Sequence, residues 1–313
     1  MIKISACIAT WKRADKLKDI IFLLEDQTLP KSEYEIVVVD SKSPDHTNQT
    51  IKKLQKRFDN IVYIEDADNV LAAKRNAGVY NANGEVIVFM DDDVYPTRGF
   101  LEAHYNANQK PSNTFFCGQI RFPTDDIERS NYYYFRDQQH LKEKDVGREL
   151  SFNNIVVMNL SFRKEYYDVT GEVDERFIGY GCEDIEFGWR VKRAGFHIKY
   201  LPEALAIHRE DSSNIVEYGN KLYKSGLYGN RILKAVSPDA HAALKGRYAL
   251  IGYILSLWLF RSLIEKRLLR TDGDRSKYDY KLFKAYLYAK SFQGRRDQKK
   301  YPPLSLDSTK KGW

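Results

Sequence analysis

The chain has 313 residues, of which 43% are apolar and 30% are charged. This length allows one large domain or two smaller ones, and the apolar fraction excludes wholesale disorder. The three cysteines are far apart and lack the spacing of a metal site, so neither a disulfide framework nor a zinc knuckle is expected. The start of the chain has no signal-peptide pattern, and no run of eighteen apolar residues occurs, so we expect a soluble, cytosol-facing protein.

The first hundred residues alternate between strand and helix patterns. Strands are predicted at 3–9, 35–40, 61–65 and 85–90, with helices between them at 15–26, 46–58 and 70–81. This alternation is typical of βαβ units in a parallel sheet. Ligands of such sheets bind beyond the carboxyl ends of the strands. The polar residues that the sequence places there are Thr10, Asp40, Asp66, Asp91, Asp92 and Asp93.

The chain becomes less regular after this half. Strand patterns occur at 114–122, 154–162 and 197–201, and the tyrosine-rich segment 130–149 is expected to form a loop or short helices. Residues 183–194 predict a helix with an acidic first turn, which ends at Gly195. From Ile215 onward the pattern is helical.

The charge of the carboxyl-terminal region is strongly basic. Residues 231–313 carry 19 basic and 7 acidic residues, whereas the rest of the chain carries 31 and 36. An uncharged, largely apolar stretch, 248–260, is followed directly by Arg261, Lys266, Arg267 and Arg270. Its length suits a buried helix or a segment in the lipid interface. Attachment to an anionic membrane surface and packing on the main body both remain open, and without a nucleic-acid-binding motif we expect no nucleic acid partner.

Three consecutive carboxylates, Asp91 to Asp93, follow an apolar strand directly. Hard oxygen ligands at a strand end suit Mg²⁺ or Mn²⁺, and a cation there could neutralise a departing diphosphate. The alternative is an acidic turn before the next helix. The strand-end position favours the metal.

A second set follows the strands of the same half. Thr10 and Arg13 lie where the crevice of a parallel sheet opens, and Asp40 could accept hydrogen bonds from a base or a ribose. Arg75, on the predicted helix that leads into the acidic strand, belongs to the same set. The alternative for Asp40 is a structural role in a turn, and the alternative for Arg75 is an ordinary surface cation.

A third set surrounds the start of the helix at 183–194. Gly179 and Gly181 allow close approach to a ligand, and either Glu183 or Asp184 could act as a general base. Acidic residues also stabilise a helix N-terminus, so position alone does not decide. His208 is the one histidine placed to bind a metal, although a lone histidine is more often structural.

In this order the motifs resemble family 2 glycosyltransferases of the GT-A fold. The resemblance covers roughly residues 3–210. The segments that carry it are 7–13 (CIATWKR), 37–41 (VVVDS), 73–78 (AKRNAG), 84–93 (GEVIVFMDDD), 159–163 (NLSFR), 171–177 (GEVDERF) and 181–186 (GCEDIE). The last of them also resembles the Gly-x-Glu-Asp motif of galactosyl- and N-acetylgalactosaminyl-transferring relatives.

The resemblance implies an inverting, metal-dependent transfer of a sugar from a nucleotide, with UDP expected, to a glycan hydroxyl. It assigns the base to Asp184 and a site for Mn²⁺ or Mg²⁺ to Asp91, Asp93 and His208. The residues that it implies for acceptor or donor-sugar contacts are Tyr180, Gly181, Glu183 and Asn159. Those that it implies for nucleotide contacts are Thr10, Arg13, Asp40, Arg75, Asp91 and Asp92.

The expected fold is therefore α/β, a Rossmann-like GT-A domain with a mostly parallel sheet and a helical carboxyl-terminal extension. We expect a catalytic domain at 1–214, with a nucleotide-sugar half (1–110) and an acceptor half (111–214), and a basic helical region at 215–313. A basic, aromatic tail suggests a lipid-linked oligosaccharide acceptor at the inner face of the membrane, as in capsule or O-antigen synthesis. A sugar nucleotidyltransferase and a non-catalytic binding protein remain the alternatives, although no glycine-rich loop follows the first strand.

Overall fold

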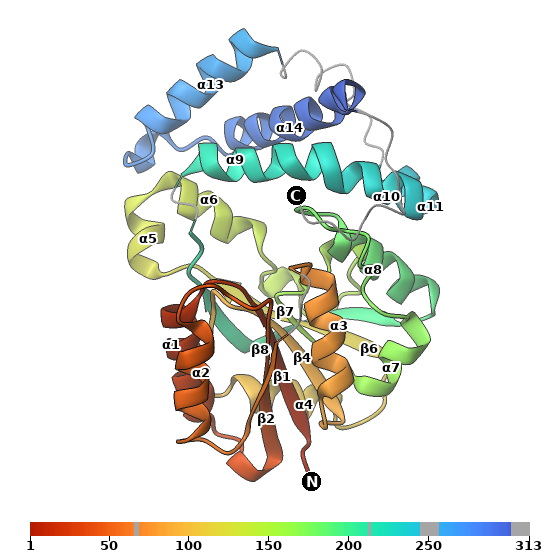
Figure 1. Ribbon diagram of the computed structural model, residues 1–313. Helices are drawn as coiled ribbons and strands as arrows, with labels where there is room; N and C mark the ends of the chain where they lie inside the picture. Colours follow the sequence, from red (N-terminus) through yellow and green to blue (C-terminus); the bar gives the residue numbers. More distant parts are fainter. Residues whose placement is uncertain (66–68, 212–213, 245–256, 302–313) are drawn as a thin grey trace.

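A sheet of eight strands forms the centre of the computed structural model, which describes residues 1–65, 69–211, 214–244 and 257–301 (Figure 1). The strands lie in the order β3-β2-β1-β4-β7-β6-β8-β5. Their bounds are β1 (Ile4–Thr10), β2 (Tyr34–Asp40), β3 (Ile61–Glu65), β4 (Val86–Asp91), β5 (Val94–Pro96), β6 (Thr114–Arg121), β7 (Asn159–Arg163) and β8 (His197–His208).

The parallel register of the first strands brings their polar ends together. Every residue of β1 and β2 is buried, as the apolar runs predict for strands covered on both faces. Thr10 pairs with Asp40, and Ala9 pairs with Asp91. The predicted strand-end positions of Thr10, Asp40 and Asp91 along one edge of the sheet are therefore confirmed, while Asp66, predicted for the same edge, lies outside the described residues.

The second half of the sheet is mixed. β7 is antiparallel to both β4 and β6, and β5 is antiparallel to β8. The other four of the seven strand pairings among the described residues are parallel. The predicted strand at 154–162 is wrong in its first part, because pairing with β4 begins only at Asn159, opposite Met90. β8 is longer than predicted, because β6 pairs with both of its halves across a register shift at Gly118–Gln119.

Helices cover both faces of the sheet and bury one apolar cluster on each. α1, α2 and α4 pack on one face, and α3, α7 and α8 pack on the other. The bounds of the helices are α1 (Ala14–Glu25), α2 (Thr47–Gln55), α3 (Leu71–Asn81), α4 (Phe100–Asn108), α5 (Thr124–Arg129), α6 (Asn131–Gln139), α7 (Lys164–Thr170), α8 (Glu183–Arg193), α9 (Ile215–Lys224), α10 (Asn230–Val236), α11 (Pro238–Ala243), α13 (Trp258–Arg270) and α14 (Tyr280–Asp297).

The carboxyl-terminal helices form a layer across the upper end of the molecule in Figure 1. Their apolar cluster joins α14 to α6, which lies in the segment predicted as a loop or short helices. Most of the apolar stretch 248–260 lies outside the described residues. No described helix combines the length and the hydropathy that crossing a membrane requires.

Glycines bring this layer into backbone contact with the turn before α8. A single turn of π-helix, Ser225–Gly229, connects α9 to α10. A Cβ atom on Gly229 would lie 2.0 Å from the carbonyl oxygen of Gly181, and a Cβ on Gly226 would lie 2.2 Å from the carbonyl oxygen of Ser291 in α14. The π-helix is therefore held between the turn and α14 without room for a methyl group at either contact.

We expect Gly229→Ala to lower the free energy of unfolding by about 1–3 kcal/mol, because the added methyl group would overlap backbone that cannot rotate away. Urea denaturation measures the change. Gly273→Ala is the matched control, since the nearest atom to its Cβ is 4.0 Å away. Equal losses in the two variants would contradict the close backbone contact.

Candidate active site

The side chain of Arg75 joins two regions that are far apart in the sequence. It projects from α3 and is 5% exposed. Nη2 donates to Oδ1 of Asp91 at 3.0 Å, and Nη1 donates to Oδ1 of Asp184 at 3.3 Å. Burial disfavours the charged guanidinium, but the two carboxylates outweigh that cost and raise the pKa of Arg75. The end of β4 and the start of α8 therefore meet in one charged cluster, and Arg75 is not a surface cation.

Three consecutive polar residues fix this part of α3. Lys74 donates from Nζ to the carbonyl oxygen of Thr10 at 3.0 Å, and burial lowers its pKa. Asn76 donates to the carbonyl oxygen of Val173 at 2.9 Å and accepts from Tyr167 at 2.6 Å. Lys74 and Asn76 are not among the site residues predicted from the sequence. Their signal was a polar triplet in a helix otherwise rich in alanine and glycine.

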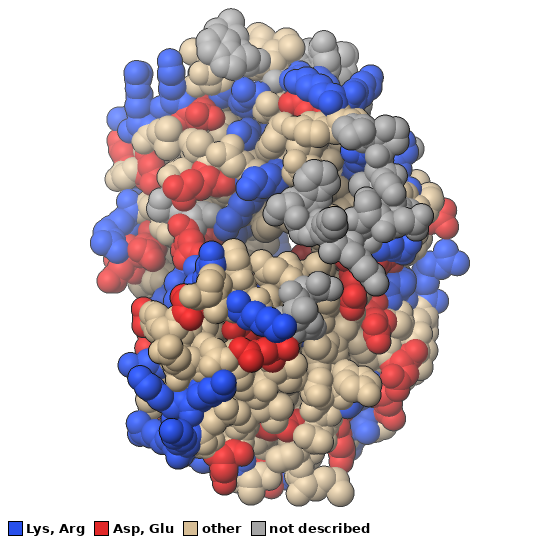
Figure 2. All heavy atoms as spheres, in the orientation of Figure 1, with Lys and Arg blue, Asp and Glu red and all other residues tan. Residues whose placement is uncertain are grey.

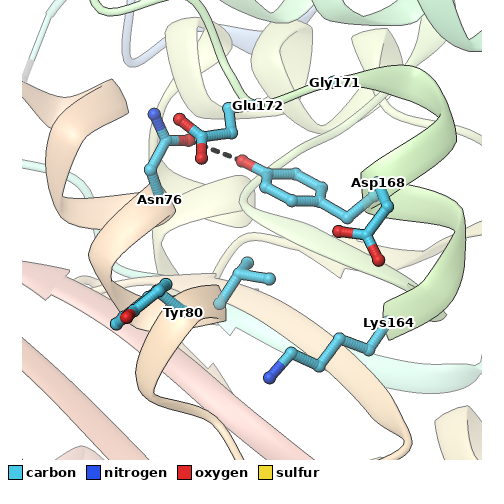
Figure 3. A pocket seen from close by; sticks show the side chains of 8 residues that line it. Asn76, Tyr80, Lys164, Asp168, Gly171 and Glu172 are labelled. Carbon is cyan, nitrogen blue, oxygen red and sulfur yellow. Dashed lines mark hydrogen bonds between the residues drawn. The ribbon is translucent and has the colours of Figure 1, made fainter.

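A hollow of 440 Å³ lies behind Asn76, between α3 and α7. Figure 3 shows Asn76 at one side of it, with Lys164 and Asp168 at the other. The hydroxyl group of Tyr167, which also lines the hollow, donates a hydrogen bond to Asn76. Arg75 and Asp184 do not line this hollow. The hollow therefore lies between α3 and α7, apart from the charged cluster around Arg75.

The carboxylate of Asp92 faces the end of β1. Thr10 donates to its Oδ2 at 2.8 Å, and Nε of Arg13 lies 3.8 Å from its Oδ1. Burial raises the pKa of Asp92 to about 6, although the hydrogen bond from Thr10 acts in the opposite direction. Arg13 also pairs with Asp211, which the sequence reasoning did not consider. The structure thus brings Thr10, Arg13 and Asp92 together.

Asp40 is fully buried and is occupied by its own turn. It accepts hydrogen bonds from the backbone N–H of Ser43 at 3.1 Å, from the Ser43 hydroxyl at 2.5 Å and from Tyr63 at 2.9 Å. Of the two roles that the sequence leaves open, this geometry favours the turn.

Asp93 and His208 form a separate pair where β5 meets β8. Oδ1 of Asp93 lies 3.4 Å from Nε2 of His208. Burial alone would raise the pKa of Asp93, but the hydrogen bond from His208 and the nearby charges of His208, Lys16 and Arg13 together outweigh burial and lower it. Nδ1 of His208 is buried without a hydrogen-bond partner in the described structure.

The expected three-residue metal site is not assembled. Within the described ranges, no three His, Cys, Asp or Glu side chains form a cluster that could hold a metal. Asp91 ends β4 and is bound by Arg75, whereas Asp93 lies in the turn before β5 and contacts His208. The pair of Asp93 and His208 does fit part of a coordination shell, because neighbouring ligands of one divalent cation are about 3 Å apart when each bond is about 2.1 Å.

Two adjacent carboxylates begin α8. The turn before them is tight, with Gly181 at φ +90° and Cys182 at φ +77°. Burial raises the pKa of Glu183 to about 7, and the neighbouring charge of Asp184 adds to the effect. Burial also raises the pKa of Asp184, against the attraction of Arg75. Asp184 keeps 35% of its side-chain surface exposed, so one carboxylate with a raised pKa is accessible to solvent beside the charged cluster.

Tyr180 lies beside this turn, near a buried ion pair that the sequence reasoning missed. Nη2 of Arg136 lies 3.1 Å from Oε2 of Glu210, and the guanidinium lies 3.8 Å from the ring centre of Tyr218 in α9. Burial and the nearby Tyr218 raise the pKa of Tyr180, which remains 46% exposed. An arginine within the aromatic segment 132–136 was the available signal.

The side chain of Asn159 lies apart from the charged cluster around Arg75. Its amide donates to the carbonyl oxygens of Gln119 and Ala204 at 3.1 and 3.0 Å and accepts from His104 at 2.8 Å. It is fully buried, and these three bonds use its side chain inside the sheet.

Comparisons with known proteins agree with this architecture. The sequence profile described as glycosyl transferase family 2 matches residues 5–169. The glycosyltransferase AglE of Haloferax volcanii is 25% identical, over 66% of each chain. A poly(ribitol-phosphate) beta-glucosyltransferase of Bacillus spizizenii is 32% identical, over 38% of this chain and 19% of its own length.

Two solved structures share the fold. Staphylococcus aureus TarS in complex with UDP-GlcNAc superimposes with a TM-score of 0.53 at 15% identity, over 96% of this chain and 92% of its own. A mannosyltransferase of Pyrobaculum calidifontis in complex with GDP-Man and Mn²⁺ gives a TM-score of 0.59 at 13% identity, over 95% and 86%. These matches confirm the expected GT-A fold, with its mixed sheet and carboxyl-terminal helices.

The family match covers more than half of the chain and decides against a sugar nucleotidyltransferase and a non-catalytic binding protein. The chain belongs to glycosyl transferase family 2 and is a glycosyltransferase.

Proposed function

We propose that the protein transfers a hexose or an N-acetylhexosamine from a UDP-sugar to a hydroxyl group of a glycan, with inversion at the sugar carbon. The observation that carries this proposal is the ion-pair bridge from Asp91 through Arg75 to Asp184. It places a partly exposed carboxylate of raised pKa beside the end of the strand where a GT-A donor is expected. The UDP-GlcNAc complex of the structural neighbour supports UDP as the nucleotide.

The acceptor that we propose is a lipid-linked precursor of a cell-surface polysaccharide, as for a capsule or an O-antigen, extended at the inner face of the membrane. Two observations support it. Relatives include a poly(ribitol-phosphate) glucosyltransferase and a chondroitin synthase, both named for polymeric products or acceptors. The carboxyl-terminal region also carries the excess of positive charge.

In this proposal, different groups of residues contact the nucleotide and the sugars. Thr10, Arg13 and Asp92 lie together at the end of β1 and would contact the nucleotide. Arg75 would contact the diphosphate from the base of the cleft, while Tyr180, Gly181 and Glu183 would border the sugars. An exposed tyrosine ring beside a carboxylate suits a sugar, which presents an apolar face and hydroxyl groups.

Asp93 and His208 are the residues that would hold Mn²⁺ or Mg²⁺, and diphosphate oxygens would complete its coordination. When bound, such a cation neutralises the charge that grows on a leaving diphosphate. The Mn²⁺ complex of the structural neighbour supports this assignment. Asp91 has a different role in the proposal, because its carboxylate fixes Arg75.

Asp184 would act as the general base. The acceptor oxygen forms a bond to the anomeric carbon as the bond from that carbon to the diphosphate oxygen breaks, and the hydroxyl proton moves to the carboxylate of Asp184. Protonation of Asp184 removes one of the two negative partners of Arg75. The guanidinium charge is then available to the diphosphate at the moment when its negative charge increases.

Asp184→Asn tests the base directly. We expect transfer to fall by at least about 100-fold, the usual contribution of a positioned base, while the donor still protects the protein against heat unfolding. A panel of UDP-, GDP- and TDP-sugars with Mn²⁺ would be assayed with both the wild-type protein and the variant. Full transfer by the variant would contradict the role of Asp184, and protection by another nucleotide alone would contradict UDP.

The pH dependence follows from the carboxylate pair. Burial raises the pKa of Glu183 to about 7 and also raises the pKa of Asp184 above its ordinary value. A base must be deprotonated, so we expect kcat/KM to fall as Asp184 takes up its proton, at a pH above that at which an exposed aspartate does so, and to level off at higher pH. A rate that stays constant down to about pH 5 would exclude the pair from the reaction.

Loss of either proposed metal ligand should weaken binding of the cation. We expect Asp93→Asn and His208→Gln to raise the Mn²⁺ concentration for half-maximal binding by at least about tenfold. Calorimetric titration with Mn²⁺ in the presence of a UDP-sugar measures this. Asp125→Asn, at an exposed position outside the cleft, is the control for lost charge, and an unchanged midpoint in both site variants would place the metal elsewhere.

A further inference from the structure

The outer face of α13 carries cations and large apolar side chains that remain exposed in the part of the chain that the structure describes. Phe260, Leu263 and Leu269 are 47%, 57% and 46% exposed. The cations Lys266, Arg267 and Arg270 are exposed on the same side of the helix. Within the described structure, none of the three forms an ion pair with an acidic side chain.

The opposite face of α13 already supplies its contacts with the protein. Leu268 is 2% exposed in the cluster shared with α14, and Ile264 packs against that cluster. Glu265 is the single acidic residue of the helix, and its carboxylate accepts a hydrogen bond from Tyr286 of α14 at 2.6 Å. The outer face therefore presents no negative charge of its own helix and is not needed to attach α13 to α14.

A basic depression continues this face. It measures 770 Å³ and lies between the end of α13 and the start of α14. Three cations and one carboxylate are among the side chains that line it, together with two tyrosine rings: Arg267, Lys277, Lys281, Asp279, Tyr278 and Tyr280. Cations and tyrosine rings in one depression suit a phosphate-bearing headgroup, because the ring lies at the polar–apolar boundary while the cation meets the phosphate.

We propose that the outer face of α13 docks on an anionic lipid bilayer, with its cations at the headgroup phosphates and its leucine and phenylalanine side chains at the acyl boundary. This inference names the surface behind the proposed membrane location, and it does not depend on the transfer reaction. Figure 2 shows Lys and Arg side chains over the upper end of the molecule, where Figure 1 places α13 outermost.

The chemistry of the face favours a bilayer over other partners. A soluble polyanion would meet the cations but would leave Phe260 and Leu263 in water, whereas a bilayer interface takes up both kinds of group. A second copy of the chain that paired through the same face would bring Lys266, Arg267 and Arg270 against an identical set of cations. The carboxyl-terminal layer also contacts the turn before α8, so docking would hold the cleft near lipid-linked molecules.

Co-sedimentation of the full chain with vesicles tests the proposal. We expect binding to vesicles of phosphatidylserine in phosphatidylcholine and none to phosphatidylcholine alone. Lys266→Gln/Arg267→Gln/Arg270→Gln should reduce the partition coefficient by about 100-fold, because each cation near an anionic surface contributes about fivefold. Lys52→Gln/Lys53→Gln/Lys56→Gln removes the same charge from exposed positions around α2 and should bind like the wild type.

A second variant tests the apolar part. Phe260→Ser/Leu263→Ser should weaken binding and leave a remainder that salt abolishes, because only screened charge attraction is left. Wild-type binding by the α13 charge variant, or an equal loss in the α2 variant, would overturn the proposal. Displacement by soluble polyphosphate together with unchanged binding of the serine variant would assign the face to a polyanion and would also overturn it. Heat protection by UDP-sugars, measured without vesicles, separates failure here from failure of the proposed transfer.

Discussion

The buried guanidinium of Arg75 is the interaction on which the cleft depends. A buried charge is costly unless it is paired, and removal of one partner leaves the other uncompensated. Arg75 meets this constraint with Asp91 at the end of β4 and Asp184 at the start of α8. The helix α3, the sheet and α8 are therefore tied together at the point where the chemistry is proposed.

The same constraint explains why the acidic residues have different roles. Asp91, Asp92 and Asp93 are consecutive, yet they contact Arg75, Thr10 and His208 respectively. Each partner comes from a different element of the fold. Burial raises the pKa of Asp92, whereas the hydrogen bond from His208 and nearby positive charges lower that of Asp93, so these two adjacent carboxyl groups have different proton affinities. Their environments, more than their shared residue type, determine what each can do.

The carboxyl-terminal helices contribute to the site from outside the segment that matches the family. Gly229 and Gly181 bring the π-helix against the turn that carries Glu183 and Asp184. π-turns inside helices frequently mark functional positions, and this one lies between α14 and the proposed base. The layer therefore contacts the turn before the proposed base on one side, while the outer face of α13, on the other side, is exposed in the described structure.

Local sequence patterns were sufficient to predict the alternation of strands and helices, the polar edge of the sheet and the charged motifs. Buried β-branched runs and strand-end carboxylates are local patterns, and the parallel register of β1, β2 and β4 followed from them. Local patterns also predicted a strand at 154–162, and there the tertiary pairing of β7 set a later start.

The hydrogen-bond and ion-pair partners of these side chains could not be predicted from such patterns, because they depend on how distant segments pack. Asp91, expected at the metal site, is bound by Arg75, and Asp40 accepts hydrogen bonds from its own turn. Asn159 makes its hydrogen bonds inside the sheet. The tertiary structure also revealed the support from Lys74, Asn76 and Arg136. The physical reason is that a carboxylate or an amide can satisfy its hydrogen bonds with many partners, and which of them is within 3 Å depends on how distant segments pack.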